Sequence, residues 1–398
     1  MAAHDTAWIG TWDLPKTRGA DALTVCERDR ATGALTPIRS LLPGVSVGAM
    51  HLDERRRVLY VTDEDTRHGA DRQGAGGSVI ALAVHDDGAL VEIGRRPSYG
   101  SLPSYVAVDP TGGFLLVTNH TASAPVARLA GSRAGDYRMT LAYDTATTVL
   151  FPLGGDGGIG EPLDVLVHDA PAGPRPGQTH PRPHCVVASP SGAFFVVCDK
   201  GSDRILTIGV DADAGRIRPL AGDGFAAPPG SSPRYAAFHP TRPFLFVNHE
   251  TAPIVSSFRH TDAGELVPIG TADVLLADGD GAGARQSDLR VHPSGAFVFS
   301  LVRGDDSVCV LAVDEASGSL RPLHTVRVGA AAPRGCAISP DGAFLYIASA
   351  GGDEVSAWRI DAHGGLTPAG APLRTPAPGA IVLHAPRADT PRSQKGNP

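Results

Sequence analysis

Short apolar segments separated by tight turns recur along the whole chain. One unit is an apolar segment, a proline turn and a second apolar segment, as in SYVAVDPTGGFLLVTN, HCVVASPSGAFFVVCD, RYAAFHPTRPFLFVNH, LRVHPSGAFVFSLV and GCAISPDGAFLYIAS. A degenerate copy, AMHLDERRRVLYVTD, has a glutamate at the proline position. Because β-branched and aromatic residues flank the turn, each copy predicts a strand, a turn and a strand. The anchor position of the turn is occupied by Glu54, Pro110, Pro190, Pro240, Pro293 and Pro340.

A second unit alternates with the first and consists of a polar turn followed by Gly-x-Leu or Gly-x-Ile. Its seven copies are DRATGALTP, HDDGALVEI, GGDGGIGEP, DADAGRIRPL, TDAGELVPI, DEASGSLRPL and DAHGGLTPAG. A tight glycine turn between two apolar segments indicates a hairpin. Four short strands in every 50 residues or so, repeated seven times, predict an all-β fold, a seven-bladed β-propeller.

The two ends of the chain are predicted to complete one blade together. The seventh inner strand is expected in GAIVLHAP (379–386), and the segments AWIGTW and ADALTVCER supply the other strands of that blade. Closing the ring in this way removes free sheet edges. We therefore predict one propeller domain over 5–386, followed by a disordered tail over 387–398. The long interval between Pro110 and Pro190 predicts an insertion of about 30 residues within 122–178, and a smaller insertion is expected at 67–77.

Composition narrows the possible partners. The 398 residues are 42% hydrophobic and carry 35 Lys and Arg against 42 Asp and Glu, a formal net charge of −7. This balance argues against binding to nucleic acid or to an anionic membrane, and no apolar run approaches the roughly 20 residues of a membrane helix. The five cysteines form no CxxC pair and the first residues do not resemble a signal peptide, so a reduced, cytoplasmic protein is expected. No glycine-rich phosphate loop opens a helix, and no cofactor is predicted.

The repeat allows residues at equivalent places in different blades to be compared. At the inner-strand position, six residues before the anchor, the copies carry Gly48, Ser104, His184, Arg234, Ser287 and Arg334. At the second-strand position, ten residues after the anchor, they carry Glu64, His120, Lys200, Glu250, Arg303 and Ala350. Antiparallel pairing brings the two positions to the same end of the blade. Small and ionisable residues alternate there, which indicates a functional ring at the channel mouth; a solvated rim of charges is the alternative.

Several segments resemble one known family. SSPRYAAFHPTRPFLFVNHET is similar to the G-P-R-H-x-x-F-H-P…V-x-N-E segment of the seven-bladed lactonase family, which contains the propeller-type 6-phosphogluconolactonases and the fungal carboxy-cis,cis-muconate cyclases. QTHPRPHCVVASPSGAFFVVCDKGSDRI resembles its Q-x-x-P-H-x-H…D-L-G-x-D-R-V segment, and SVCVLAVDEASGSL and EVSAWRIDAHGGLTP resemble its blade-closing strands. The likeness covers 5–386. It implies that a histidine, two arginines and a glutamate act on the substrate, and these fall on His184, Arg234, Arg303 and Glu250.

The sequence also departs from the family pattern at the same place. Arg182 replaces the first histidine of P-H-x-H, Tyr235 replaces the histidine after Arg234, and Lys200 replaces the leucine of D-L-G. His120 stands where tyrosine is common, and Ala350 where glutamine is usual. These changes predict an altered pocket lining. The expected substrate-binding residues are Glu64, His120, Arg182, Lys200, Tyr235 and Arg334.

These residues suit a lactonase that opens a sugar-type lactone such as 6-phosphogluconolactone. Glu250 or His184 would act as general base on water, and Arg234 and Arg303 would bind an anionic group or support an oxyanion. The same groups would also serve a cyclase, isomerase or lyase acting on a carboxylated small molecule, of the muconate-cyclase kind. A non-catalytic propeller that binds protein partners is the other alternative. The sequence does not decide the oligomeric state.

Two further patterns are not expected to carry chemistry. Gly44–Gly48 matches G-x-S-x-G, but no helix follows to present Ser46 as a nucleophile. His180 and His184 have the spacing of two zinc ligands on a helix, but the prolines between them prevent that helix. No metal site is predicted.

Overall fold

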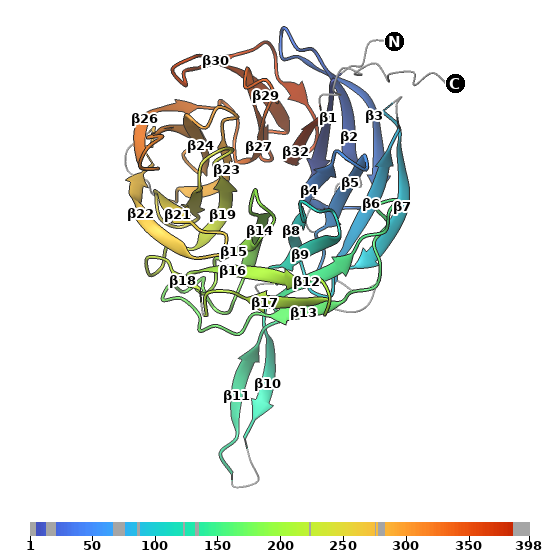
Figure 1. Ribbon diagram of the computed structural model, residues 1–398, viewed down its shortest axis with the longest axis vertical. Coiled ribbons are helices and arrows are strands. Elements are labelled where there is room, and N and C mark those ends of the chain that lie inside the picture. The colour runs from blue at the N-terminus through green and yellow to red at the C-terminus, as the bar shows by residue number, and fades with distance from the viewer. Residues whose placement is uncertain are drawn as a thin grey trace, which may run out of the picture.

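The computed structural model describes residues 5–12, 21–66, 76–85, 88–121, 124–131, 135–222, 224–274, 276–277 and 283–384. The predicted tail at 387–398 and most of the predicted smaller insertion, 67–75, lie outside the described residues. Seven antiparallel sheets are arranged around a central axis like the blades of a propeller (Figure 1). The predicted fold is confirmed. Among the described residues, no helix is long and apolar enough to span a membrane.

Each blade has four main strands. The ring-closing blade contains β1 (Asp5–Thr11), β2 (Asp21–Arg28), β3 (Leu35–Pro43) and β32 (Pro378–His384). The next contains β4 (Val47–Asp53), β5 (Val58–Asp63), β6 (Ser78–Val84) and β7 (Leu90–Pro97). The third contains β8 (Pro103–Val108), β9 (Phe114–Asn119), β12 (Thr147–Pro152) and β13 (Asp164–Val167).

The remaining four blades follow the same plan. The fourth blade contains β14 (Pro183–Ala188), β15 (Phe195–Asp199), β16 (Arg204–Asp211) and β17 (Arg216–Pro219), with β18 (Phe225–Ala226) beside β16. The fifth contains β19 (Pro233–Phe238), β20 (Phe244–His249), β21 (Ile254–His260) and β22 (Leu266–Asp273), and the sixth contains β23 (Arg285–Val291), β24 (Phe297–Arg303), β25 (Ser307–Val313) and β26 (Leu320–Arg327). The seventh contains β27 (Pro333–Ile338), β28 (Phe344–Ser349), β29 (Glu354–Ile360) and β30 (Leu366–Pro368), with β31 (Leu373–Arg374) beside β29.

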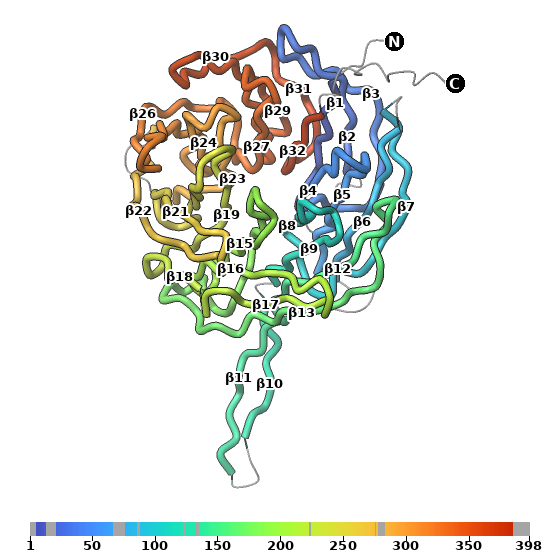
Figure 2. Tube along the Cα trace, viewed as in Figure 1, coloured from blue at the N-terminus to red at the C-terminus, as the bar shows by residue number. Residues whose placement is uncertain are grey.

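The ring closes as predicted. β32, at the end of the described chain, pairs antiparallel with β1, and Trp8 lies opposite Val382. The first and last described strands, β1 and β32, therefore lie side by side, as the tube in Figure 2 shows. One blade built from both ends ties the first and last strands together by a ladder of hydrogen bonds.

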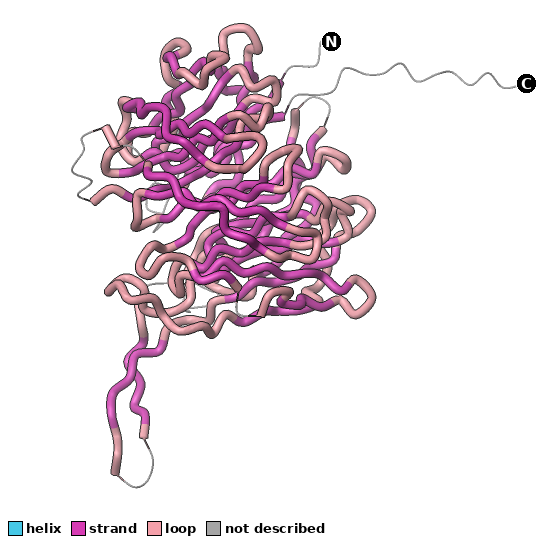
Figure 3. The backbone as a smooth tube through the Cα atoms, turned by 60° about the vertical axis from the view of Figure 1, so that its left-hand side comes forward, coloured by secondary structure: helices cyan, strands magenta, loops and turns pink. Residues whose placement is uncertain are grey.

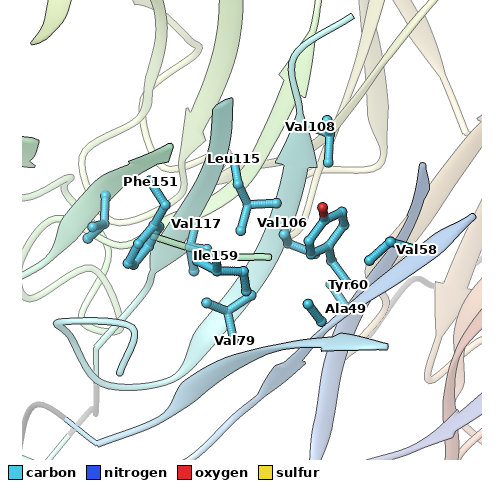
Figure 4. Close-up of a cluster of buried hydrophobic side chains, with 12 residues drawn as sticks. Ala49, Val58, Tyr60, Val79, Val106, Val108, Leu115, Val117, Phe151 and Ile159 are labelled. Atoms are coloured by element: carbon cyan, nitrogen blue, oxygen red, sulfur yellow. The ribbon is translucent and has the colours of Figure 1, made fainter. Parts of the chain in front are cut away.

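Apolar side chains fill the spaces between neighbouring blades. One such cluster joins the second and third blades, where Tyr60, Val106, Val117 and Phe151 are fully buried (Figure 4). The Tyr60 hydroxyl donates a 2.8 Å hydrogen bond to the Gly157 carbonyl, so its polar end is satisfied in the core. Strands whose two faces are both covered in this way have near-continuous apolar sequences, which explains why the repeat units are so apolar.

The long interval between anchors contains a two-stranded hairpin. β10 (Val126–Ala130) and β11 (Arg138–Ala142) are inserted between β9 and β12 and pair with each other. The hairpin extends away from the ring (Figures 1 and 3). An insertion within 122–178 is thereby confirmed.

Candidate active site

A repeated backbone hydrogen bond places the two compared positions side by side in the blades. In six blades the N–H of the second-strand residue donates to the carbonyl two residues before the inner-strand position, at 2.7 to 3.1 Å. The donor and acceptor pairs are Trp12–Ala377, Glu64–Ser46, His120–Leu102, Lys200–Arg182, Glu250–Ser232 and Ala350–Ala332. In the remaining blade, Arg303 lies opposite Arg285 in the strand register. The side chains at these positions therefore start from one end of the ring.

The first cluster of polar side chains, the Glu64 group, surrounds a buried carboxylate. Trp12 Nε1 donates to Glu64 Oε2 at 2.6 Å, and His120 Nε2 lies 3.1 Å from Oε1. Nη2 of Arg334 is 3.5 Å from Oε2, and its guanidinium lies over the Trp12 ring at 3.9 Å. Gly48 leaves room for this carboxylate, because a Cβ there would lie 3.2 Å from Glu64 Oε2.

The second cluster, the Glu250 group, has one carboxylate shared by three cations. Lys200 Nζ lies 2.8 Å and Arg234 Nε 3.2 Å from Glu250 Oε2, while Arg303 Nη2 lies 3.4 Å from Oε1. Arg234 is almost completely buried, and its Nη1 donates to the Ser287 carbonyl at 2.5 Å. This second contact orients the guanidinium toward the carboxylate.

His184 lies between the two groups. Its ring stacks on that of His120, with centroids 5.3 Å apart, and contacts Tyr235 at 5.3 Å. Its Nδ1 is buried and has no hydrogen-bond partner among the described residues. Tyr235 in turn lies under the guanidinium of Arg234, 4.7 Å from ring centroid to Cζ. The two charged clusters therefore flank a buried imidazole nitrogen that the described residues leave without a hydrogen-bond partner.

Arg182 completes the set of predicted residues. Its Nη2 is 3.3 Å from His120 Nδ1, and its backbone N–H donates to Asp199 Oδ1 at 2.6 Å. All ten predicted site residues are thus linked to one another by direct contacts. The structure brings together, from six blades, Glu64, His120, Arg182, His184, Lys200, Arg234, Tyr235, Glu250, Arg303 and Arg334.

The carboxylates and the bases have displaced pKa values. Burial alone would raise the pKa of Glu64, but the hydrogen bond from His120 and the charge of Arg334 outweigh it and lower the pKa to about 2. Burial would likewise raise the pKa of Glu250, and the charges of Lys200, Arg234 and Arg303 hold it well below its ordinary value. Both carboxylates are ionised at neutral pH.

The basic groups also have lowered pKa values, in their case mainly because of burial. Burial lowers the pKa of His184 well below 6.5, and the nearby charges of Arg234 and Lys200 lower it further, so the imidazole is neutral. Burial lowers the pKa of Lys200 to about 7 despite the attraction of Glu250. A neutral imidazole and an amine that titrates near pH 7 are both suited to proton transfer.

The loops behind the site are held by two buried aspartates. Asp199 Oδ1 also accepts the backbone N–H groups of Gly201 and Ser202. Asp203 accepts the N–H groups of Gly230 and Ser232, at 2.6 and 2.8 Å. Ser232 has a positive φ of 58° and precedes the start of β19 by one residue. Asp203 therefore stabilises the turn from which Arg234 reaches Glu250.

Two features of the site were not predicted. Trp12 occupies the second-strand position of the ring-closing blade, directly after β1, and the comparison of six copies omitted it. The serines at the inner-strand position have a structural role, because Ser104 Oγ donates to the His184 carbonyl at 2.9 Å and Ser287 Oγ to the Pro333 carbonyl at 2.6 Å. They connect neighbouring inner strands. Extending the repeat to the seventh blade would have found Trp12.

A cavity of about 500 Å³ lies at the other end of the channel, against the anchor turns at Glu54, Pro110 and Pro190. It reaches inward to Tyr105, whose ring contacts that of Tyr235 edge-on at 5.4 Å. The two tyrosines therefore separate this cavity from the charged cluster. The linked titratable groups all lie at the charged end, on the other side of the two tyrosines. The described residues contain no group of three or more His, Cys, Asp or Glu arranged to hold a metal ion.

The fold and the site define a seven-bladed propeller with charged groups from several blades gathered at one channel mouth. Residues 6–383 match the family described as "Lactonase, 7-bladed beta-propeller". The chain belongs to this family, which confirms the predicted family and the predicted class of enzyme, a lactone hydrolase.

Individual relatives are distant. The chain is 25% identical over 277 residues to the 6-phosphogluconolactonase of Bacillus subtilis, covering 69% of this chain and 71% of that protein. It is 24% identical over 302 residues to the 6-phosphogluconolactonase of Serratia proteamaculans, covering 74% and 84%. The periplasmic gluconolactonase of Pseudomonas aeruginosa has the same fold, with a TM-score of 0.83 and 24% identity over 96% of this chain and 99% of that one. The predicted cytoplasmic location stays a prediction.

Proposed function

We propose that this protein hydrolyses a small sugar-type lactone that carries an anionic group, with 6-phosphogluconolactone as the first substrate to test. The Glu250 group is the observation that carries the proposal: one carboxylate shared by Lys200, Arg234 and Arg303 beside the unpartnered imidazole of His184. With Arg182 and Arg334, the two groups hold five cationic side chains against two carboxylates. Such an excess attracts a phosphate or carboxylate. Relatives named 6-phosphogluconolactonase support the same substrate class.

In this proposal His184 is the general base and Glu250 positions the cations. A carboxylate that neutralises three cations is a weak base, because accepting a proton would leave those cations without a counter-charge. The imidazole of His184 is neutral and its Nδ1 has no partner, so it can accept a proton from water. Burial and the nearby cations disfavour the protonated ring, and the negative charge that develops on the substrate in the same step offsets part of that cost. Arg234 and Arg303 would stabilise the oxygen that becomes negative.

The reaction balances with these groups alone. Water attacks the lactone carbonyl carbon while His184 takes one of its protons, and the carbonyl oxygen becomes an oxyanion beside a guanidinium. The carbonyl then re-forms, the bond from its carbon to the ring oxygen breaks, and His184 returns the proton to that oxygen. The product is a hydroxy acid, released as its carboxylate. No oxidant, reductant or further co-reactant is required.

The test follows acid release from 6-phosphogluconolactone and from an unphosphorylated gluconolactone at constant pH. We expect the phosphorylated substrate to react with the higher kcat/KM, and His184→Ala and Glu250→Gln each to lower kcat/KM at least about 100-fold. Glu354→Gln is the matched control, because Glu354 is a buried glutamate whose ion pair, at 2.9 Å, is with Arg374 and not with a site residue. Unchanged rates in both site variants would overturn the assignment, even with the fold intact.

A further inference from the structure

The β10–β11 hairpin leaves the ring as an arm. Among the described strands, β10 and β11 pair only with each other. Figure 3 shows the arm extending beyond the body of the propeller. A two-stranded ribbon in water is at best marginally stable, and a third strand or a packed face is normally needed. An extended arm of this kind therefore indicates a packing partner outside its own chain.

The ribbon has one apolar face and one mixed face. Residues directly opposite each other in antiparallel strands share a face, and the faces alternate along each strand. In the observed register Ala127 lies opposite Leu141 and Leu129 opposite Met139, so these four residues form one face, the arm face. The other face carries Val126, Arg128, Ala130, Arg138, Thr140 and Ala142.

The arm face is open to solvent. Leu129, Met139 and Leu141 are 66%, 65% and 63% exposed, and Tyr137, just before β11, is 57% exposed. Together these large side chains present a patch on the order of several hundred Å², a size that on soluble proteins usually marks an interaction site. Isolated exposed apolar residues are common, but a contiguous group on one face of a projecting ribbon is not.

A second apolar surface lies next to the base of the arm. β13 is the outermost strand of the blade from which the arm emerges. Leu163, directly before β13, and Val165 and Val167 within it form one row, the β13 row, with 46%, 39% and 51% exposure. Val167 lies opposite Thr147, five residues after the end of β11. An exposed apolar edge strand of this kind readily pairs with another chain unless it is covered.

We propose that the arm face of each chain covers the β13 row of a second copy, in a reciprocal two-fold dimer. Because both surfaces belong to one blade, a two-fold axis beside that blade satisfies both at once, as an isologous interface requires. Contact between the two arms alone would involve one short ribbon face per chain, well below the roughly 800 Å² per partner of a standard interface. In the reciprocal dimer the contact between an arm face and a β13 row is made twice, once by each arm.

The charges of the arm and of the whole chain also favour a second copy as the partner. The two strands of the arm carry Arg128 and Arg138 and no acidic residue, whereas the whole chain has a formal net charge of −7. The arginines lie on the face opposite the arm face, so they act at long range: a cationic arm is attracted to an acidic body of its own kind as the two chains approach. An anionic lipid surface would attract the arginines but repel the rest of the chain, so a second copy is the better partner.

The first experiment measures the mass of the full chain in solution by light scattering and sedimentation at about 1 to 100 μM, the range in which a weak dimer assembles. We expect twice the 41.1 kDa of one chain. The double variant Leu129→Asp, Met139→Asp should be monomeric at every concentration in this range. Val126→Asp is the matched control, because Val126 is 60% exposed on the opposite face of the same ribbon, and this variant should stay dimeric. A monomeric parent, or a dimer that survives the double variant, would overturn the proposal.

The second experiment tests which surfaces meet. The five native cysteines are all buried, so Leu129→Cys and Val165→Cys chains can be prepared separately, mixed and oxidised. A disulfide-linked species of twice the chain mass that forms in the mixture, and not with either variant alone, supports docking of the arm on the β13 row. Linkage with Leu129→Cys alone would indicate contact between two arms. Sedimentation of the monomer with anionic vesicles, lost in the double variant, would show that the arm binds lipid; either result contradicts the proposal.

Discussion

Nε1 of Trp12 donates a 2.6 Å hydrogen bond to Oε2 of Glu64, and so joins the ring-closing blade to the carboxylate of the next blade. The same indole ring lies against the guanidinium of Arg334. Because β1 is held in the ring by its pairing with β32, closure of the propeller and assembly of the Glu64 group depend on each other. Stability and activity should therefore respond together to changes at Trp12.

Trp12→Phe tests this dependence. The variant keeps an aromatic ring beside Arg334 but removes a donor to a buried, ionised carboxylate, which costs about 1.5 to 3 kcal/mol in the free energy of unfolding. Trp358→Phe is the control, since Nε1 of Trp358 donates to the neutral hydroxyl of Ser356 at 2.9 Å, and its loss should cost less. Urea unfolding of both variants measures the difference. Equal losses would show that the charge of Glu64 contributes nothing to the Trp12 contact.

The amine of Lys200 should set an alkaline limit on the hydrolysis of anionic lactones. Its pKa of about 7 means that the amine is charged below pH 7 and loses its charge above it. If the charged form attracts the substrate, kcat/KM, which reports the free enzyme, falls about tenfold between pH 6.5 and 8. Initial rates corrected for spontaneous hydrolysis provide the measurement.

Lys200→Arg is the sharp comparison for this pH dependence. A guanidinium stays charged throughout the range, so the variant should keep the attraction and lose the decline between pH 6.5 and 8. Lys200→Met should show a low, nearly constant kcat/KM from pH 6.5 to 8. A parent profile that Lys200→Arg reproduces would assign the limit to another group.

The propeller was predictable because each repeat depends on residues that are close to one another in the sequence. Every blade needs a tight turn between two apolar strands, so Pro110, Pro190 and Pro240 recur with flanking strands even where other residues differ. The candidate site residues could be predicted from the sequence for the opposite reason. At positions that are equivalent in geometry, a change of residue type from Gly48 to His184 indicates a local role rather than a requirement of the blade.

Other features needed the folded chain. The hydrogen bond from Trp12 to Glu64 crosses between blades, and no local pattern specifies which side chains meet there. The unpartnered Nδ1 of His184 and the depressed pKa of Lys200 result from burial among groups that are distant in sequence. The arm was predicted only as extra length. Its apolar face depends on the register of β10 with β11, and a shift of one residue would move Leu129 to the other face.

Buried histidines should make the protein sensitive to mild acid. His249 lies between the hydroxyls of Ser231 and Ser256, at 2.9 and 2.8 Å, and burial lowers its pKa to about 4. The unfolded chain takes up this proton near pH 6.5 while the folded chain does not until about pH 4. The neutral histidine therefore contributes stability that is complete above pH 6.5 and is lost, by about 3 kcal/mol, as the pH falls to 4.

His249→Gln isolates this contribution. At pH 7.5 the variant loses only the native contacts of His249, so its free energy of unfolding at that pH is the reference for its values at lower pH. Between pH 6 and 4.5 its free energy of unfolding should fall less steeply than that of the parent, by about 1 kcal/mol per pH unit. Urea unfolding at four pH values is sufficient. Parallel curves for the two proteins would mean that His249 takes up its proton equally in both states.

Gly48 should be required for the shape of the Glu64 group. It stands at the inner-strand position of its blade, where a Cβ would lie 2.6 Å from the Pro103 carbonyl oxygen and 3.2 Å from Glu64 Oε2. The first distance, to a backbone atom, is too short for any side chain, so Gly48→Ala must displace β4 from β8 and thereby move the backbone beside the Glu64 carboxylate. We expect a loss of about 1 to 3 kcal/mol in the free energy of unfolding and at least a tenfold fall in kcat/KM. Gly270→Ala in β22 is the control, because a Cβ there meets no atom within 4 Å, and both quantities should stay close to those of the parent. A Gly48→Ala protein that is destabilised but fully active would show that the inner-strand position supports the blade without shaping the site.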